Sequence, residues 1–492
     1  MAERKINLDN WQEEYNRKLV SPEEAAKVIK SGDNIFIPST FSGQVPACLV
    51  ERADELRNVI VEIQSPLGDP GWLGEGLEES FTIIPRIFLG GLARDAHDEG
   101  RMSFLPYTNY TWSKVYHDNR PGKRDVDVCL LDVSSPDENG FMTFGGAVWE
   151  RKGYAQHAKT VIVEVDPTAI RSHGDTFIHV SQVDYIVNEP AEGPSREELE
   201  ELINQMPEEL HSAAWENLPD MRPRTITYIK ENFDDIDENR LRRLFNVYEP
   251  DEATLAIARN VKSLMRDGDT IQIGIGQPSM YIVDLGAFDD CNDLAIFSEM
   301  GCRGMGFLVQ RGIATGKYAT LHPGKAVFGA LTGLSREELD WANDNPAIEQ
   351  YSVDYVVNIP NIMKQKNMLS INNATQIDLI GQITCETQFG PRMINGPGGQ
   401  IEFHMGAVGA PGGRAISLLY STWGDGGIST IVPYLEQGSM VTIPRAYADY
   451  VITEWGVAEL FGKTHAERAE ALIEIAHPDF KDELREAAKT IF

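Results

Sequence analysis

The sequence predicts an α/β fold with two related domains, each a mainly parallel sheet with helices packed on it. Three observations support this prediction. A long repeat relates residues 23–65 to residues 255–301, apolar runs rich in Val, Ile and Leu recur in both halves, and helix-prone segments alternate with those runs. Such runs are typical of parallel strands that are covered on both faces. The length of 492 residues also exceeds a typical single domain, which has about 100 to 200 residues.

Each copy of the repeat predicts the same order of elements. A helix closed by Gly-Asp comes first, at Gly32 in one copy and at Gly268 in the other. An alternating strand, a turn rich in Gly or Ser, a second helix and a second strand follow. Glycine suits the end of a helix because a positive φ carries no Cβ penalty there. Aligning the copies places Gln64 of the first opposite Glu299 of the second.

Further strands and helices are expected outside the repeat. "DVDVCLLDVSS" (125–135) and "AKTVIVEVD" (158–166) predict strands in the first half, and "SVDYVVNI" (352–359) predicts one in the second. The C-terminal segment 456–492 is helix-prone, with a break at its His-Pro pair.

Composition divides the chain into three parts. Residues 195–250 are acidic, helix-prone and free of strand pattern, so they predict a helical connector. The expected organisation is therefore an N-terminal domain over 1–194, the connector over 195–250, and a C-terminal domain over 251–492.

Charge and cysteine usage exclude several classes of function. A formal net charge of −31 argues against binding to nucleic acid or to a membrane surface. Five scattered cysteines without a CxxC pair, a polar N-terminal segment and no long uncharged apolar run favour a cytoplasmic location. His173 and His179 have no common zinc spacing, and no HExxH motif occurs, so no metal is predicted. The absence of GxSxG argues against an ordinary serine thioesterase.

The first candidate for chemistry is Glu299 in "IFSEMGCRG" (296–304), an acid at the end of an apolar run that is followed by two glycines, Gly301 and Gly304. Open α/β sheets bind ligands outside the carboxyl ends of their strands, where this carboxylate is expected. The alternative is an acid that is only exposed or ion-paired at a strand end.

Two glycine-rich segments are further candidates. "GIGQPSMY" (274–281) predicts a strand, a glycine turn and a helix that could receive an anion, although it lacks a complete dinucleotide or P-loop motif and also fits a plain tight turn. The segment 395–427 is dense in glycine, which leaves backbone N–H groups free for an oxyanion hole. Ile401, Phe403, Ile416, Leu418 and Leu419 give it a strand-like pattern, so ordered turns are favoured over flexibility.

Several stretches taken together resemble the class I coenzyme A transferases, in the acetyl-CoA hydrolase/transferase branch that includes 4-hydroxybutyrate CoA-transferase. They are "DVSSPDENGF" (132–141), "HGDTFIHVSQVDYIV" (173–187), "SEMG" (298–301), "IDLIGQI" (377–383), "GPGGQIEF" (396–403) and the run from 441 to 480. The resemblance covers nearly the whole chain outside the connector, and it implies the family I CoA-transferase fold.

The resemblance also implies site residues. Glu299 takes the place of the family's nucleophile, and the N–H groups of Gly398 and Gly399 would stabilise the oxyanion. The residues implied in binding coenzyme A are Gly274, Ile275, Gly276, Gln277, Pro278, Gly398, Gly399 and Gln400.

The implied activity is transfer of CoA from a short or medium acyl-CoA to acetate or a similar acid, by ping-pong chemistry through a glutamyl-CoA thioester. Coenzyme A is then a substrate, no cofactor is tightly bound, and a homodimer is expected by family likeness. Two alternatives remain: an acyl-CoA hydrolase that uses the same Glu299, and a CoA-binding protein without activity.

The acyl group is not readable from the sequence. Gln44, Met300 and Phe389 are candidates for its pocket. The chain departs from the family at "GIGQPS" where G-I-G-G-I-P is frequent, at Phe297 in place of His, and at Thr430 in place of Arg. These positions are expected near the acyl and carboxylate pockets, so they bear on the substrate and not on the nucleophile.

Overall fold

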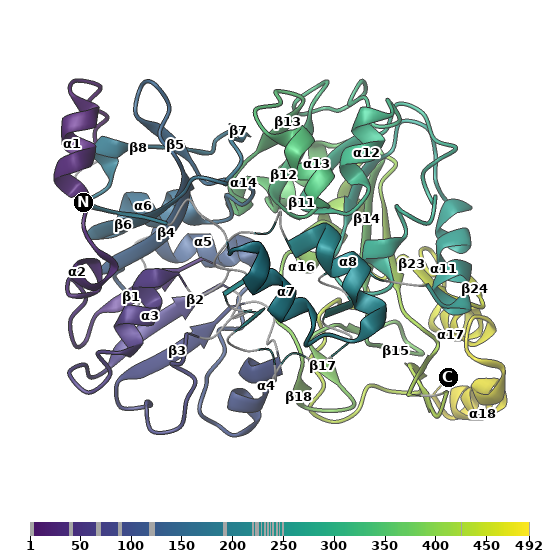
Figure 1. Ribbon diagram of the computed structural model, residues 1–492. Helices are drawn as coiled ribbons and strands as arrows, with labels where there is room; N and C mark the ends of the chain where they lie inside the picture. Colours follow the sequence, from purple (N-terminus) through teal and green to yellow (C-terminus); the bar gives the residue numbers. More distant parts are fainter. Residues whose placement is uncertain are drawn as a thin grey trace.

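The computed structural model describes residues 4–38, 43–64, 70–86, 91–117, 124–189, 194–218, 250–424 and 426–491, with scattered residues between 219 and 249. Two α/β halves lie side by side, the first drawn in purple to blue and the second in green to yellow (Figure 1). The N-terminus lies at the outer end of the first half and the C-terminus at the outer end of the second (Figure 1).

The first half is built on a six-stranded parallel sheet in the order β3-β2-β1-β4-β6-β9. Its strands are β1 (Asn34–Ile37), β2 (Val59–Ile63), β3 (Phe81–Pro85), β4 (Val128–Ser134), β6 (Thr160–Asp166) and β9 (Tyr185–Asn188). Its helices are α1 (Trp11–Lys18), α2 (Pro22–Ala26), α3 (Gln44–Val50), α4 (Gly91–Asp98), α5 (Asn109–His117) and α6 (Arg151–His157). Ile35 and Ile37 face one buried cluster and Phe36 faces another, so both faces of the sheet are covered.

The second half is built on a nine-stranded sheet in the order β24-β23-β19-β14-β10-β11-β12-β13-β7, parallel except for β24. Its strands are β7 (His173–Gly174), β10 (Thr270–Ile273), β11 (Ala295–Cys302), β12 (Ala326–Gly333), β13 (Ile348–Gln350), β14 (Met368–Asn373), β19 (Arg414–Leu418), β23 (Tyr450–Thr453) and β24 (Gly456–Glu459). Its helices are α11 (Glu252–Lys262), α12 (Met305–Gln310), α13 (Arg336–Ala342), α14 (Val353–Val356), α15 (Ile359–Lys364), α16 (Gln400–Gly409), α17 (His465–Glu474) and α18 (Lys481–Ile491).

Small sheets complete the fold. They pair β5 (Phe141–Thr143) with β8 (Phe177–His179), β17 (Thr387–Gln388) with β18 (Arg392–Met393), β20 (Thr422–Trp423) with β21 (Ile428–Ser429), and β15 (Gln376–Asp378) with both β16 (Ile383–Thr384) and β22 (Ile431–Val432). The 3₁₀ turns include η1 (Val180–Gln182), η2 (Glu208–Leu210), η5 (Ser279–Tyr281) and η6 (Pro478–Phe480).

The two sheets share one topology, which confirms the repeat. Six strands of the second sheet, β23-β19-β14-β10-β11-β12, follow the order of β9-β6-β4-β1-β2-β3 in the first. The register agrees as well, because Asn34 pairs with Ile60 and Thr270 pairs with Ala295. Counting four residues on from Ile60 and Ala295 reaches Gln64 and Glu299, so these two side chains hold equivalent places.

Five local predictions were wrong. The helices α2 and α11 end at Ala26 and Lys262, so Gly32 and Gly268 lie in later turns and do not close them. The helix expected after "GIGQPS" is only the short η5, and "SVDYVVNI" forms α14 and the start of α15. Ile401 and Phe403 lie in α16, which is buried on most of its surface and therefore gives no amphipathic period in the sequence. The segment 456–459, expected to be helical, forms the antiparallel edge strand β24.

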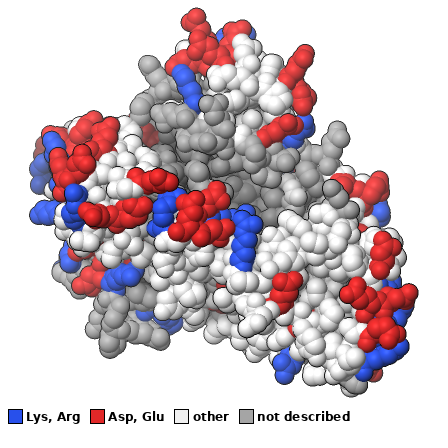
Figure 2. Space-filling view, turned by 90° about the horizontal axis from the view of Figure 1, so that it is seen from below, with Lys and Arg blue, Asp and Glu red and all other residues white. Residues whose placement is uncertain are grey.

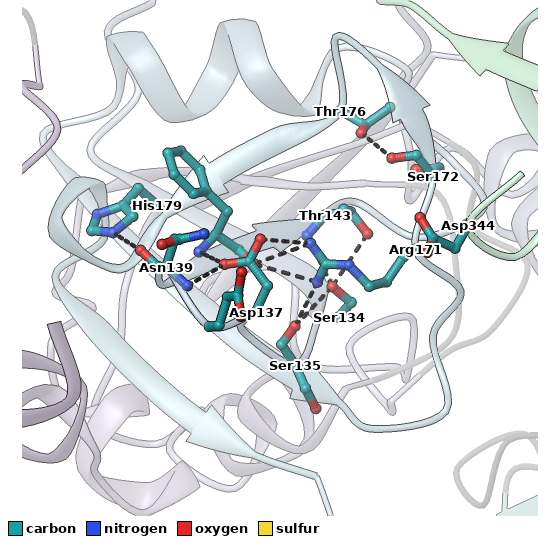
Figure 3. A network of polar contacts seen from close by, with 12 residues as sticks. Ser134, Ser135, Asp137, Asn139, Thr143, Arg171, Ser172, Thr176, His179 and Asp344 are labelled. Carbon is teal, nitrogen blue, oxygen red and sulfur yellow. Dashed lines mark hydrogen bonds and ion pairs between the residues drawn. The ribbon is translucent and has the colours of Figure 1, made fainter. Parts of the chain in front are cut away.

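One strand of the first half belongs to the second sheet. β7 pairs with β13, and a Cβ at Gly174 would overlap the backbone of Gln350. Arg171 fixes this crossing, because its carbonyl accepts from the Asp344 N–H at 2.8 Å and its guanidinium meets Asp137 at 3.2 Å. Figure 3 shows how Arg171 reaches from this edge into the loop that holds Asp137. The family-like stretches around residues 132 to 141 and 173 to 187 therefore join the two halves.

The predicted connector begins with α7 (Arg196–Ile203) and α8 (His211–Asn217), which share a hydrophobic cluster with residues further along the connector. Much of the connector beyond residue 218 lies outside the described residues. On the face seen in Figure 2, Lys and Arg side chains lie next to Asp and Glu. Within the described residues, no helix has both the length and the apolar character needed to cross a membrane.

Candidate active site

Glu299 lies near the carboxyl end of β11, a central strand between β10 and β12. The pairing of β11 with β12 is irregular between Met300 and Cys302, directly after Glu299. Such an irregularity bends the strand and turns its side chains away from the regular alternation. The partly buried Glu299 side chain lines a cavity of about 430 Å³. Glu299 therefore lies toward the carboxyl end of a central strand, as predicted, and faces a cavity.

Both halves of the chain hold this carboxylate. The Nδ2 of Asn109, at the start of α5, donates to Oε1 of Glu299, and the N–H of Gly399 also hydrogen-bonds to Glu299. The Asn109 N–H donates to the Gly398 carbonyl at 3.1 Å, which joins the glycine turn to the same contact. A Cβ at Gly399 would overlap Oε2 of Glu299, so glycine is required for this close approach.

Burial raises the pKa of Glu299 to about 8, and the charge of Glu402 adds to this rise while the Asn109 hydrogen bond opposes it. Burial also raises the pKa of Glu402 to about 7, opposed by its hydrogen bond with Thr108. A carboxyl with so strongly raised a pKa in a cavity is a candidate for chemistry.

The cavity gathers most of the predicted residues. Those that line it are Gly274, Ile275, Gly276, Gln277, Glu299, Met300, Gly398, Gly399 and Gln400. Pro278, Gln44 and Phe389 are not among its lining residues. Gln44 instead donates its N–H to Glu164 at 3.1 Å, and Phe389 packs 6.4 Å from Trp423, which does line the cavity.

Polar contacts from Ser279 and Asn373 hold the turn at residues 274–277. Ser279 Oγ donates to the Gly274 carbonyl at 2.6 Å, and Asn373 Nδ2 donates to the Ile275 carbonyl at 3.0 Å. A Cβ at Gly274 would overlap the Asn372 side chain. The turn therefore has a fixed shape without the helix that the sequence predicted after it.

Sequence reasoning missed several residues at this site. Thr108 and Asn109 come from "YTNYTW", which matches no motif, and Arg94 lines the cavity from α4 of the first half. Glu402 lies inside the family-like "GPGGQIEF", so that stretch was a signal for it. Two positions at which the chain departs from the family pattern differ in location. Thr430 lines the cavity, whereas Phe297 is buried in a hydrophobic cluster.

Two further features bear on the chemistry. Among the residues that the structure describes, no group of three or more His, Cys, Asp or Glu side chains could hold a metal ion. All five cysteines are free, and the pKa of the Cys385 thiol, which lines the cavity, is raised to about 12 by burial. A thiol with that pKa is not poised as a nucleophile.

Comparison with known proteins shows the family of the chain. The acetyl-CoA hydrolase/transferase N-terminal domain matches residues 3–193, and the C-terminal domain of the same name matches residues 335–488. The chain is 36% identical to a 4-hydroxybutyrate coenzyme A transferase of Clostridium kluyveri over 98% of this chain and 100% of that protein. It is 31% identical to a butyryl-CoA:acetate CoA-transferase of Anaerostipes caccae over 96% of each chain.

A solved structure has the same fold. The crystal structure of RipA from Yersinia pestis superposes with a TM-score of 0.77 at 26% sequence identity, covering 98% of this chain and 99% of that chain.

Proposed function

We propose that this chain, which belongs to the acetyl-CoA hydrolase/transferase family, transfers CoA from a short or medium acyl-CoA. The proposed acceptor is acetate or a similar carboxylic acid. The observation that carries the proposal is the partly buried carboxylate of Glu299, held by Asn109 and Gly399 on the wall of the cavity. The names of the two relatives, which act on 4-hydroxybutyrate and on butyryl-CoA with acetate, support the substrate class.

In the proposed reaction the Glu299 carboxylate attacks the thioester carbon. The C–S bond breaks, CoA thiolate leaves with the electron pair, and a mixed anhydride remains. The thiolate then attacks the Glu299 carbonyl carbon, the anhydride C–O bond breaks, and the acid departs to leave a glutamyl-CoA thioester. An incoming carboxylate reverses these steps, so thioester energy is retained. No step changes an oxidation state, so the reaction needs no redox group.

Each addition step creates a tetrahedral oxyanion. The N–H of Gly399 lies at the carboxylate, and Gly398 precedes it in the same turn, where a positive φ of 54° sets the direction of the backbone. One such donor typically lowers the barrier by about 3 to 4 kcal/mol. Gly398, Gly399 and Gln400, together with the turn at 274–277, are the proposed contacts to CoA. Pro278, which was also expected to contact CoA, does not line the cavity and is left out of these contacts.

The experiment is incubation of the enzyme with acyl-CoA followed by mass spectrometry of the peptide that holds Glu299. A CoA adduct on that peptide is expected, and it should disappear on addition of acetate as acetyl-CoA forms. Glu299→Gln should keep its fold and lose the adduct. Glu386→Gln is the matched control, because Glu386 is also a buried carboxyl whose pKa burial raises. Full activity in Glu299→Gln would refute the assignment.

The same assay separates the alternatives. Thiol release at the full rate without acetate would indicate a hydrolase, and tight CoA binding without any adduct would indicate a binding protein. A homodimer and a cytoplasmic location remain parts of the proposal, tested by light scattering and by cell fractionation.

A further inference from the structure

Trp423 is an exposed aromatic residue on the wall of the cavity that holds Glu299. It lines the cavity and is nevertheless 55% exposed, so it lies where the cavity opens to solvent. It ends β20, which pairs with β21 through Trp423 and Ile428. Its ring meets Phe389 edge-on at 6.4 Å between centroids, and such a contact covers at most one face of the indole. Trp423 therefore offers a flat apolar surface on which a ligand ring could stack.

Arg94 lines the same cavity from the first half of the chain. Among the described residues of the cavity wall, it has the one positively charged side chain. Its Nε and Nη2 both donate to the Ile394 carbonyl, at 3.0 and 2.8 Å. Its Nη1 makes no hydrogen bond to any residue that the structure describes. Two of the five N–H groups of this guanidinium thus remain available to an anion.

Trp423 and Arg94 lie beside one hairpin. β17 and β18 form this hairpin, with Phe389 directly after β17 and Ile394 directly after β18. Trp423 contacts Phe389, and Arg94 bonds to Ile394. Gln388 of the same hairpin lines the cavity, and α4, which holds Arg94, lies next to β17 and β18 (Figure 1). The indole and the guanidinium are therefore parts of one edge of the cavity, and we call them the rim pair.

The charges around Arg94 leave it as the cation that can receive a ligand. Burial, followed by the charge of Arg392, lowers the pKa of Arg94, and the charges of Asp95 and Asp98 oppose this fall. Arg392 is paired with Asp98 at 3.2 Å. Arg94 has no ion-pair partner among the residues that the structure describes. An anion bound here would also offset the repulsion between the two guanidiniums.

The cavity wall connects the rim pair to Glu299. The segment from Ile394 to Gly399 lines the cavity without a break, and it runs from the Arg94 contact to the Glu299 contact. A segment of this length spans at most about 18 Å. CoA carries its sulfur at one end of the pantetheine arm and its phosphates and adenine at the other. A thioester that reaches Glu299 thus leaves the nucleotide end of CoA toward the opening of the cavity.

We infer that the rim pair binds the nucleotide end of CoA, with the adenine stacked on Trp423 and a phosphate bound by Nη1 of Arg94. This inference rests on the proposed function, because it assumes that CoA is a substrate. Stacking on an aromatic side chain suits a purine ring, and a guanidinium binds phosphate oxygens through charged hydrogen bonds. Because Arg94 belongs to the first half and Trp423 to the second, CoA bound in this way joins the two halves at the cavity.

The test compares acyl-CoA with acyl-pantetheine, which carries the same thioester and lacks the nucleotide. The measured quantity is the ratio of kcat/KM for the two substrates. Trp423→Ala and Arg94→Gln should each lower this ratio by roughly 10- to 100-fold, because acyl-pantetheine never makes the lost contact. Trp423→Phe keeps a ring for stacking and should stay close to the wild-type ratio.

Two matched controls remove the same kinds of side chain elsewhere. Phe461→Ala removes a 64% exposed aromatic ring, and Arg311→Gln removes a guanidinium that is paired with Asp289 at 3.0 Å. Neither residue lines the cavity, so both variants should keep the wild-type ratio. An equal loss with both substrates in Trp423→Ala or Arg94→Gln would overturn the inference, since it would place that side chain at the acyl group or at Glu299.

A second measurement does not depend on turnover of acyl-pantetheine. ADP carries an adenine and phosphates like those of CoA, so it should inhibit the wild-type enzyme in competition with acyl-CoA. Trp423→Ala and Arg94→Gln should each raise its inhibition constant by roughly 10-fold or more. Failure of ADP to compete, or an inhibition constant that neither variant changes, would also overturn the inference. Absence of any CoA adduct in the wild-type enzyme would instead reject the proposed function itself.

Discussion

The contact between Asn109 and Glu299 gives the sharpest prediction for the site. Asn109→Leu keeps the size of the side chain and removes the Nδ2 that donates to Oε1 of Glu299. A hydrogen bond to an ionised group contributes about 1.5 to 3 kcal/mol, and one pKa unit corresponds to about 1.4 kcal/mol. Because the bond favours the ionised form, its loss should raise the pKa of Glu299 by roughly 1 to 2 units.

The assay is the rate of glutamyl-CoA formation between pH 6 and 10.5, a range that includes the wild-type pKa of about 8 and the raised pKa of the variant. The rate should fall toward acid pH as Glu299 gains a proton. The acid fall of Asn109→Leu should move to higher pH by that amount, and the rate on the acid side should drop by roughly 10- to 100-fold. Asn260→Ala is the matched control, because Asn260 lies on α11, donates to the Thr453 carbonyl of β23, and should leave the profile unchanged. An acid fall at the wild-type pH in Asn109→Leu would refute the reasoning, since it would mean that the carboxylate gains nothing from this donor.

Two further predictions test the glycine turn and the packing beneath the site. Gly399→Ala should slow adduct formation about 100-fold or more, because the new Cβ would overlap Oε2 of Glu299; Gly153→Ala, where a Cβ meets nothing within 4 Å, should keep the wild-type rate. Arg86→Met should lower the free energy of unfolding in urea by about 3 to 5 kcal/mol, because it leaves Glu150 buried without its 3.2 Å partner. Arg485→Met, which breaks an exposed ion pair, should cost about 1 kcal/mol or less, and an equal loss in both variants would contradict the argument.

Much of the fold could be predicted from local pattern. Gly32 and Gly268 have positive φ, in the turns that lead into β1 and β10, and each donates its N–H at 2.9 Å to an equivalent carbonyl in its own half. The runs over 125–135 and 158–166 form β4 and β6, because apolar residues on both sides of a chain can be buried only between two layers. The repeat also placed Glu299 at its strand end by comparison with Gln64.

The partners of Glu299 could not be predicted in this way. Asn109 lies 190 residues away in sequence, in a segment without a motif, and it meets Glu299 only because the two halves pack together. The unusual pKa of Glu299 has the same origin, since it comes from burial and from the charge of Glu402, and neither is a property of the local sequence.

The sequence by itself determined the paired α/β halves and the place of the carboxylate, because helix and strand periods and glycine positions are local properties of the chain. Tertiary structure alone decided whether each of two nearly identical segments forms a strand or a helix. "VDYIVN" at 183–188 contains β9, whereas "VDYVVN" at 353–358 begins with α14. The first segment pairs with β6, but the edge of the second sheet beyond β13 is already filled by β7. A strand needs hydrogen bonds from a distant partner, and a segment without one satisfies its backbone within itself as a helix.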